Sequence, residues 1–127
     1  MKLSKYFALA ISLLLSACSY EIEMTVDIDG DCNVNVNILN GRPQVRYIAV
    51  VEELNGKPNF ERIVWQVDGN YKKLGRFTYG SVPSGFKEVV SPETLKQDSN
   101  FYIAVNGSGG GYGMIKMEYK CLTNKGK

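Results

Sequence analysis

The chain has 127 residues, of which 44% are hydrophobic, and carries 15 basic against 13 acidic side chains. This length predicts one domain with a core of its own, and the small net charge gives no basic patch for nucleic acid. The absence of histidine from the sequence excludes Ser-His-Asp and Cys-His nucleophiles and every histidine-bound metal site.

The chain opens with a short charged segment followed by a hydrophobic run. Lys2 and Lys5 flank its start, and residues 6–15 are almost wholly apolar. The run is shorter than the about 20 residues that span a bilayer, so it predicts a secretory signal rather than a membrane helix. Residues 1–17 are interpreted as this signal, and its removal leaves 13 basic and 13 acidic residues.

The signal ends in Leu15-Ser16-Ala17-Cys18, which resembles the lipobox of bacterial lipoproteins at every position. The resemblance implies that diacylglycerol is attached to the Cys18 sulfur and that cleavage frees an amine for further acylation, for example by palmitate. Two or three chains make anchoring effectively permanent. Residues 18–20 are then the lipid anchor and a short tether. The alternative is an ordinary signal peptide with an unmodified Cys18 thiol.

The residue after the expected anchor predicts where the protein resides. Position 19 is Ser and not Asp, and the sorting rule of Gram-negative lipoproteins then favours the outer membrane. We therefore expect a cell-envelope protein that is anchored to a membrane by its lipid and faces the periplasm.

Residues 21–127 are predicted to form a single domain of short β-strands. Residues 21–29 alternate strictly between apolar and polar side chains, as a half-buried strand does. A turn at Gly30-Asp31 and a second alternating run over residues 32–38 predict a hairpin. Further strands are expected over residues 45–53, 63–67, 77–79, 86–90, 101–105 and 114–121, with Asp68-Gly69-Asn70 among the turns. The side chains expected to share one face of the strand over residues 45–53 are Val45, Tyr47, Ala49 and Val51.

Seven or eight short strands, with turn signals about every 8–12 residues, are typical of an all-β antiparallel β-sandwich. Trp65, Leu95 and the run 101–105 resemble small immunoglobulin-like lipoproteins of Gram-negative bacteria and the end of fibronectin-type-III domains. The resemblance implies a core position for Trp65, a Phe101 in place of the usual corner tyrosine, and a Tyr102 that points outward. A small β-barrel is the alternative architecture.

Two cysteines remain after the expected anchor, Cys32 and Cys121. An even pair in an oxidising compartment predicts a disulfide, here between an early strand and the last one. Two buried free thiols are the alternative.

The hairpin turn contains acidic residues at the spacing that begins a calcium loop. The positions where an EF-hand needs Gly and Glu hold Cys32 and Ile38 instead, so an ordinary acidic turn is the preferred interpretation. No metal, cofactor or catalytic residue is predicted, and the chain is not expected to be an enzyme. The oxygen-bearing residues concerned are Asp27, Asp29, Asp31 and Asn33.

The most unusual stretch is the glycine-rich run over residues 107–113. It lacks the Gly-Lys-Ser/Thr ending of a phosphate-binding loop. One interpretation is a flexible hairpin loop; the other is a protein-binding loop with Tyr112 as its aromatic anchor, near Tyr71 or Tyr79. The candidate partner-binding residues are Gly107, Gly109, Gly110, Gly111 and Tyr112.

The predicted function follows from the expected location and from the lack of a catalytic constellation. Small single-domain lipoproteins of this architecture resemble immunity proteins, which occlude a toxin in the periplasm. We expect a non-catalytic protein-binding module whose partner is a toxin or an envelope protein. The alternative is a structural envelope lipoprotein with no dedicated ligand.

Overall fold

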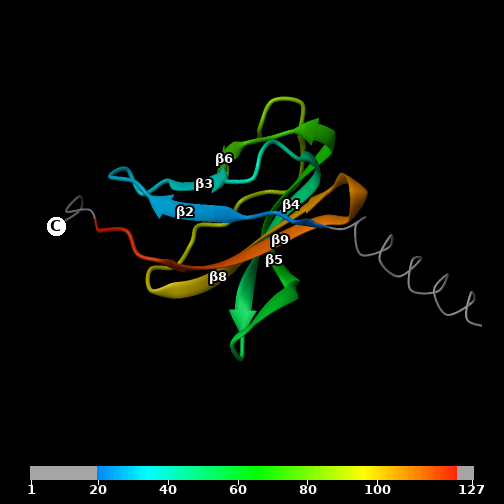
Figure 1. Ribbon diagram of the computed structural model, residues 1–127. Helices are drawn as coiled ribbons and strands as arrows, with labels where there is room; N and C mark the ends of the chain where they lie inside the picture. The colour runs from blue at the N-terminus through cyan, green and yellow to red at the C-terminus, as the bar shows by residue number, and fades with distance from the viewer. Residues whose placement is uncertain (1–19, 123–127) are drawn as a thin grey trace, which may run out of the picture.

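The computed structural model describes residues 20–122, which fold into two packed β-sheets (Figure 1). Residues 1–19 lie outside the described part, and with them the expected signal peptide and Cys18. The elements in chain order are β1 (Tyr20–Glu21), β2 (Met24–Ile28), β3 (Val34–Ile38), β4 (Gln44–Leu54), β5 (Lys57–Lys73), β6 (Arg76–Thr78), β7 (Lys87–Val90), β8 (Ser99–Gly107), the 3₁₀ turn η1 (Ser108–Gly110) and β9 (Gly111–Tyr119).

The larger sheet has the strand order β1-β9-β8-β4-β5-β7, and the smaller sheet has the order β2-β3-β6. Within the described residues β1 pairs with β9 in parallel, and the other pairings of named strands are antiparallel. Two sheets with separate ladders confirm the predicted all-β sandwich. A single closed sheet, which the small-barrel alternative requires, does not describe this arrangement.

The core lies between the sheets and is built from one side of each strand. Trp65 and Ile48 are fully buried there, and Phe101 lies with Ile103 and Val105 on the same face of β8. Burying a large apolar side chain contributes about 1.5–3 kcal/mol. The predicted core position of Trp65 is therefore confirmed.

The predicted strand over residues 21–29 is divided between the two sheets. β1 pairs with β9 of the larger sheet, whereas β2 pairs with β3 of the smaller sheet. Ile22 lies at the crossing point, is buried, and donates its N–H to the carbonyl oxygen of Tyr112 at 2.8 Å. The alternating pattern predicted which side chains are inward, but it carried no sign that the strand changes sheet.

The face predicted for the strand over residues 45–53 is wrong. A β-bulge lies between Val45 and Tyr47, so Val45 shares the core face with Ile48. Tyr47, Ala49 and Val51 lie on the opposite face of the sheet. An inserted residue shifts the alternation by one position, and the periodicity of the sequence does not reveal it.

β5 continues through Asp68-Gly69-Asn70, where a turn was predicted. Gly69 is needed there because a Cβ would collide with the Phe86 ring and with the carbonyl oxygen of Val45. The glycine thus marks an irregularity inside a strand, which is a known use of glycine in sheets.

Cys32 is paired with Cys121, 89 residues further along the chain, and their Cα atoms are 5.3 Å apart. That separation lies within the ordinary disulfide range, so the predicted pairing is confirmed. Cys32 itself lies in the hairpin turn with φ 68°, because β3 begins at Val34 and not at residue 32. The pair ties this turn to the segment that follows β9.

Candidate functional site

The acidic hairpin turn is organised by its own hydrogen bonds. One oxygen of Asp29, Oδ1, accepts the backbone N–H groups of Asp31 and Asn33 at 2.9 and 3.0 Å, and Oδ2 accepts the Asn35 amide at 3.0 Å. These bonds, that of Asn35 above all, lower the pKa of the Asp29 carboxyl. Residues 20–122 contain no cluster of three or more acidic or cysteine side chains fit to hold a metal ion.

The glycine-rich run is mostly strand, so its predicted extent as a seven-residue loop is wrong. Gly107 ends β8, Gly111 begins β9, and only the three residues of η1 connect them. Gly109 and Gly110 have φ values of 66° and 77°, a backbone conformation that favours glycine.

The strand glycines are explained by the close approach of β1. A Cβ on Gly111 would collide with the Tyr20 ring, and one on Gly113 would collide with the carbonyl oxygen of Ile22. The glycines therefore leave room for β1 at the edge of the larger sheet. The sequence showed the glycines, but not the segment that packs on them.

Tyr112 lies in β9, on the face of the larger sheet that points away from the smaller sheet. The ladders place it beside Asn106 of β8, and Asn106 beside Tyr47 of β4. Burial, and secondly the nearby Tyr47 phenol, raise the pKa of Tyr112. Tyr112 and Met114 remain 39% and 41% exposed. The Tyr112 hydroxyl donates a hydrogen bond to the Met114 sulfur at 3.7 Å.

We call this surface the tyrosine face. Its members are outward side chains of three neighbouring strands. Two of them are small, and the strand register places these two side by side, between Met114 of β9 and strand β5. The members are Tyr47 and Ala49 of β4, Ala104 and Asn106 of β8, and Tyr112 and Met114 of β9.

The same side of the larger sheet is closed further along the strands. Tyr102 points outward, as predicted, and its hydroxyl donates to the carbonyl oxygen of Gly56 at 2.8 Å. Lys116 lies over the Tyr102 ring, 5.9 Å from its centroid, and forms an ion pair with Glu53 at 2.8 Å. The Lys116 ammonium lowers the pKa of Glu53. The turn between β4 and β5 thus packs on Tyr102 on this side of the sheet, whereas Tyr112 and Met114 stay exposed.

Tyr79, one of the two tyrosines expected near Tyr112, instead supports the core. Its ring packs edge-on against Trp65 with a centroid separation of 5.3 Å. Its hydroxyl donates to the carbonyl oxygen of Glu93 at 2.6 Å, and burial raises its pKa to about 12. Tyr79 therefore makes the bond from a phenol to the backbone that Phe101 is unable to make.

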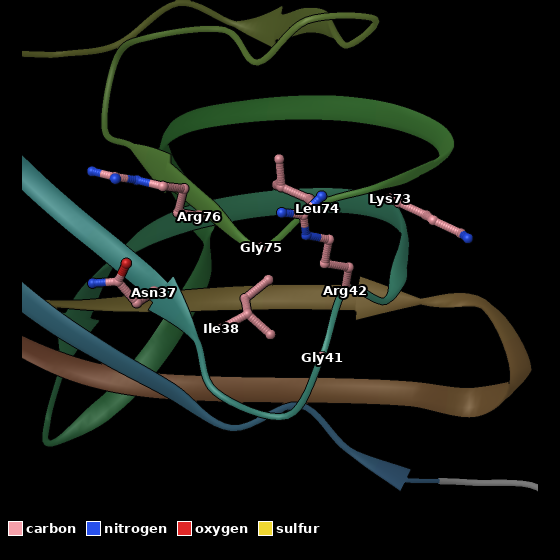
Figure 2. Close-up of a pocket in the computed structure, with 8 residues that line it drawn as sticks. All are labelled: Asn37, Ile38, Gly41, Arg42, Lys73, Leu74, Gly75 and Arg76. Carbon is pink, nitrogen blue, oxygen red and sulfur yellow. The ribbon is translucent and has the colours of Figure 1, made fainter.

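A solvent-open pocket of about 550 Å³ lies at the end of the sandwich where β4 begins and β5 ends (Figure 2). Three exposed cationic side chains line it, those of Arg42, Lys73 and Arg76. The stem of Arg42 lies across Gly75, which would meet it at 3.5 Å if it carried a Cβ. We call this region the cationic end.

Backbone bonds hold the walls of this pocket together. The N–H of Ile38 donates to the carbonyl oxygen of Gly75 at 2.9 Å, and that of Leu74 donates to Pro43 at 3.1 Å. The side chain of Asn40 accepts the N–H of Glu23 at 3.1 Å and donates to the carbonyl oxygen of Glu21 at 2.7 Å. The loop that carries Arg42 is therefore tied to the start of the described chain.

The cations of the pocket have no ion-pair partner among residues 20–122. The ion pairs in this part of the chain join Arg62 to Glu52 and Glu93, Lys116 to Glu53, and Lys120 to Glu118. Sequence reasoning missed the pocket because Arg42 lies far from Lys73 and Arg76 along the chain. The only local signal was the basic run that contains Lys72, Lys73 and Arg76.

No protein-family model matches the chain, and searches of the curated proteins and of the solved structures also return no match. Over the part that the structure describes, no helix has the length and the apolar character needed to cross a membrane.

Proposed function

We propose that this chain is a lipid-anchored protein of the cell envelope that acts as a non-catalytic protein-binding module. Its docking surface is the tyrosine face, and its anchor is the lipid on Cys18. The specific form that we propose is an immunity protein, which neutralises a toxin in the periplasm.

One observation carries this proposal: the Tyr112 phenol and the Met114 thioether stand exposed on β9, on the same side of the sheet as the half-buried Tyr47. Tyrosine and methionine are enriched at protein interfaces, whereas lysine and glutamate are depleted. Tyrosine also supplies a large, rigid contact area at a low cost in conformational entropy. The lipobox resemblance supports the anchor, and the lack of histidine supports a role without catalysis.

The location of Tyr112 changes the site that the sequence suggested. A loop that reshapes itself around a partner is replaced by a sheet face whose backbone is fixed by the ladders of β4, β8 and β9. Such a preformed surface loses less entropy when it binds. We therefore assign the partner contacts to Tyr47, Asn106, Tyr112 and Met114.

Site-specific photo-crosslinking in cells tests the proposal. A photoreactive amino acid at position 112 reports on the tyrosine face, and one at Thr25, exposed on the smaller sheet, serves as the matched control. We expect one discrete adduct from position 112 and none from position 25. Its mass identifies the partner, and the product of a neighbouring gene for a secreted effector is the first protein to compare.

Binding of the purified partner then measures the anchor residue. Tyr112→Ala should weaken binding by about 30-fold, as loss of a hot-spot aromatic costs about 2 kcal/mol or more. The exposed Phe60, near the start of β5, provides the control variant, Phe60→Ala, which should bind like the parent. Equal adducts from positions 112 and 25, or equal affinity of the parent and Tyr112→Ala, would contradict the proposal and favour the structural lipoprotein.

A further inference from the structure

Within residues 20–122, the positive charges of the cationic end form no ion pairs that would stabilise the fold. Arg42, Lys73 and Arg76 have no acidic partner in the described residues, and the neighbouring Lys72 adds to the same charge. Glu21 and Glu23 are the acids on the segment to which Asn40 binds this loop. Four cations against two carboxylates leave an excess of positive charge at this end.

The three pocket cations do not converge on one point. Figure 2 shows Arg76 and Lys73 directed to opposite sides, with Arg42 between them. A single bound phosphate or carboxylate would need donors that meet at one centre. The spread of these side chains instead fits a surface on which many phosphate groups lie side by side.

Exposed apolar side chains accompany these cations. Tyr20 is 42% exposed, Leu39 58% and Tyr71 49%. Tyr20 lies in β1, Leu39 follows β3, and Tyr71 lies just before Lys72 in β5, so all three are at or near the cationic end. Aromatic and aliphatic side chains among basic ones are typical of proteins that lie on the headgroup layer of a membrane.

The start of the described chain lies at the same end. Tyr20 packs on Gly107 and Gly111, and Glu21 is bonded to the loop that carries Arg42. Cys18 precedes Glu21 by three residues, and three residues extend at most about 10 Å. A lipid on Cys18 would therefore hold the cationic end against the membrane that contains it.

We propose that the cationic end is a membrane-contact surface that binds the phosphate groups of anionic lipid headgroups through Arg42, Lys73 and Arg76. The orientation of this surface rests on the proposed anchor, but its affinity for anionic lipid does not. It fixes the domain on the membrane with the tyrosine face standing beside the lipid surface, open to a partner. Binding weakens at high salt because exposed charges are screened.

Lysine footprinting of the full chain on vesicles tests this surface. The protein purified from the membrane fraction is placed on vesicles of phosphatidylcholine, or of phosphatidylcholine with a third of phosphatidylglycerol. A water-soluble acetylating reagent then modifies exposed lysines, and mass spectrometry gives the rates at Lys73 and at Lys57. Lys57 is the exposed first residue of β5, at the opposite end of that strand from Lys73, and serves as the internal reference.

We expect the rate at Lys73, relative to Lys57, to fall about fivefold on vesicles that contain phosphatidylglycerol, because each cation near an anionic surface contributes about that factor. The double variant Arg42→Gln/Arg76→Gln should lose this protection and keep the parent's melting temperature. Arg62→Gln, which removes a cation that pairs with Glu52 and Glu93, should keep the protection.

The other outcomes would overturn either the membrane-contact surface or the lipid anchor. An unchanged ratio on phosphatidylglycerol overturns the membrane-contact surface. Equal protection by inorganic phosphate on phosphatidylcholine shows a site for one free anion instead. Retention of the protein on pure phosphatidylcholine vesicles tests the lipid anchor alone. A protein that is not retained there would overturn the anchor, whereas the rate at Lys73 on phosphatidylglycerol would still decide the membrane-contact surface.

Discussion

The two ends of the sandwich carry their charges in different ways. Toward the end where β4 finishes, Arg62 bonds to Glu52 at 2.9 Å and to Glu93 at 3.2 Å, and Lys116 bonds to Glu53 at 2.8 Å. At the cationic end, Arg42 and Lys73 have no such partners in the described residues. The first described residues, at Glu21 and Glu23, are bonded to the loop of the cationic end, whereas the cysteine pair fastens the hairpin turn at the other end of β3.

The difference separates structural charges from charges free for a ligand. Exposed ion pairs contribute little to stability, about 0–1 kcal/mol each, but a paired cation is occupied by its own chain. An unpaired group of cations attracts anions from outside. The end with ion pairs and the disulfide is thus the structural end, and the cationic end is the one where an external phosphate is expected.

The largest expected effect concerns the structural end. Cys32→Ala/Cys121→Ala opens a loop of 89 residues, and loop-closure entropy predicts a loss of about 4–5 kcal/mol in the free energy of unfolding. Urea unfolding of the variant and of the oxidised parent measures it. The reduced parent, which should match the variant, is the control, and equal midpoints for variant and oxidised parent would show that the pair contributes nothing.

Gly113→Ala is expected to have the next largest effect. Its Cβ would collide with the carbonyl oxygen of Ile22, and strain of this kind costs about 1–3 kcal/mol. The exposed Gly30, where a Cβ meets nothing within 4 Å, provides the control variant Gly30→Ala. Thermal unfolding compares the two, and equal melting temperatures would remove the packing of β1 as the reason for these glycines.

The sequence predicted the parts of the fold that local pattern determines. Strict alternation gave the hairpin of β2 and β3, and the composition of residues 101–105 gave the inward face of β8. The even number of cysteines left after the expected anchor predicted the disulfide between Cys32 and Cys121. The bulge before Tyr47 was not predictable in this way, because an extra residue in a strand depends on the partner strand and not on the local pattern.

The candidate surfaces were harder to predict than the fold. Tyr112 was predicted as the anchor of a binding loop but lies in strand β9, and its neighbours Asn106 and Tyr47 depend on the register of three strands. The cationic end depends on loops that the fold brings together from separate parts of the chain. The pairing of Asn37 with Arg76 and of Gln44 with Lys73 makes them neighbours, together with the backbone bonds from Leu74 to Pro43 and from Ile38 to Gly75.

Tyr79→Phe should cost about 1 kcal/mol, because it removes the hydrogen bond to the carbonyl oxygen of Glu93. In the parent, the pKa of Tyr79 is raised from its ordinary value of 10.0 to about 12, so the folded state favours the neutral phenol. That stabilisation is fully present below pH 10 and is lost as pH rises toward 12. Denaturant titrations at pH 10 and pH 12 measure the free energy of unfolding. Between these pH values it should fall less in Tyr79→Phe than in the parent, and an equal fall would contradict this role.

The smallest effect directly compares the charges of the two ends. Arg62→Gln should lower the midpoint of urea unfolding slightly, since it breaks two solvent-screened ion pairs. Arg42→Gln should leave this midpoint unchanged, because Arg42 has no ion-pair partner in residues 20–122. A lower midpoint in Arg42→Gln than in Arg62→Gln would assign Arg42 a structural role and reverse the comparison.

The proposed lipid on Cys18 would hold this domain at a membrane, and cell fractionation distinguishes a lipidated from an unmodified cysteine. Fractionation of cells at high salt, with an intact mass for the protein recovered, compares the parent with Cys18→Ala. We expect a membrane-bound parent that begins at Cys18 and carries a diacylglycerol, and a variant that leaves the membrane fraction or stays unprocessed without lipid. A Cys18→Ala variant that is cleaved and still stays in the membrane at high salt, or a parent whose Cys18 carries no lipid, would contradict the proposed anchor.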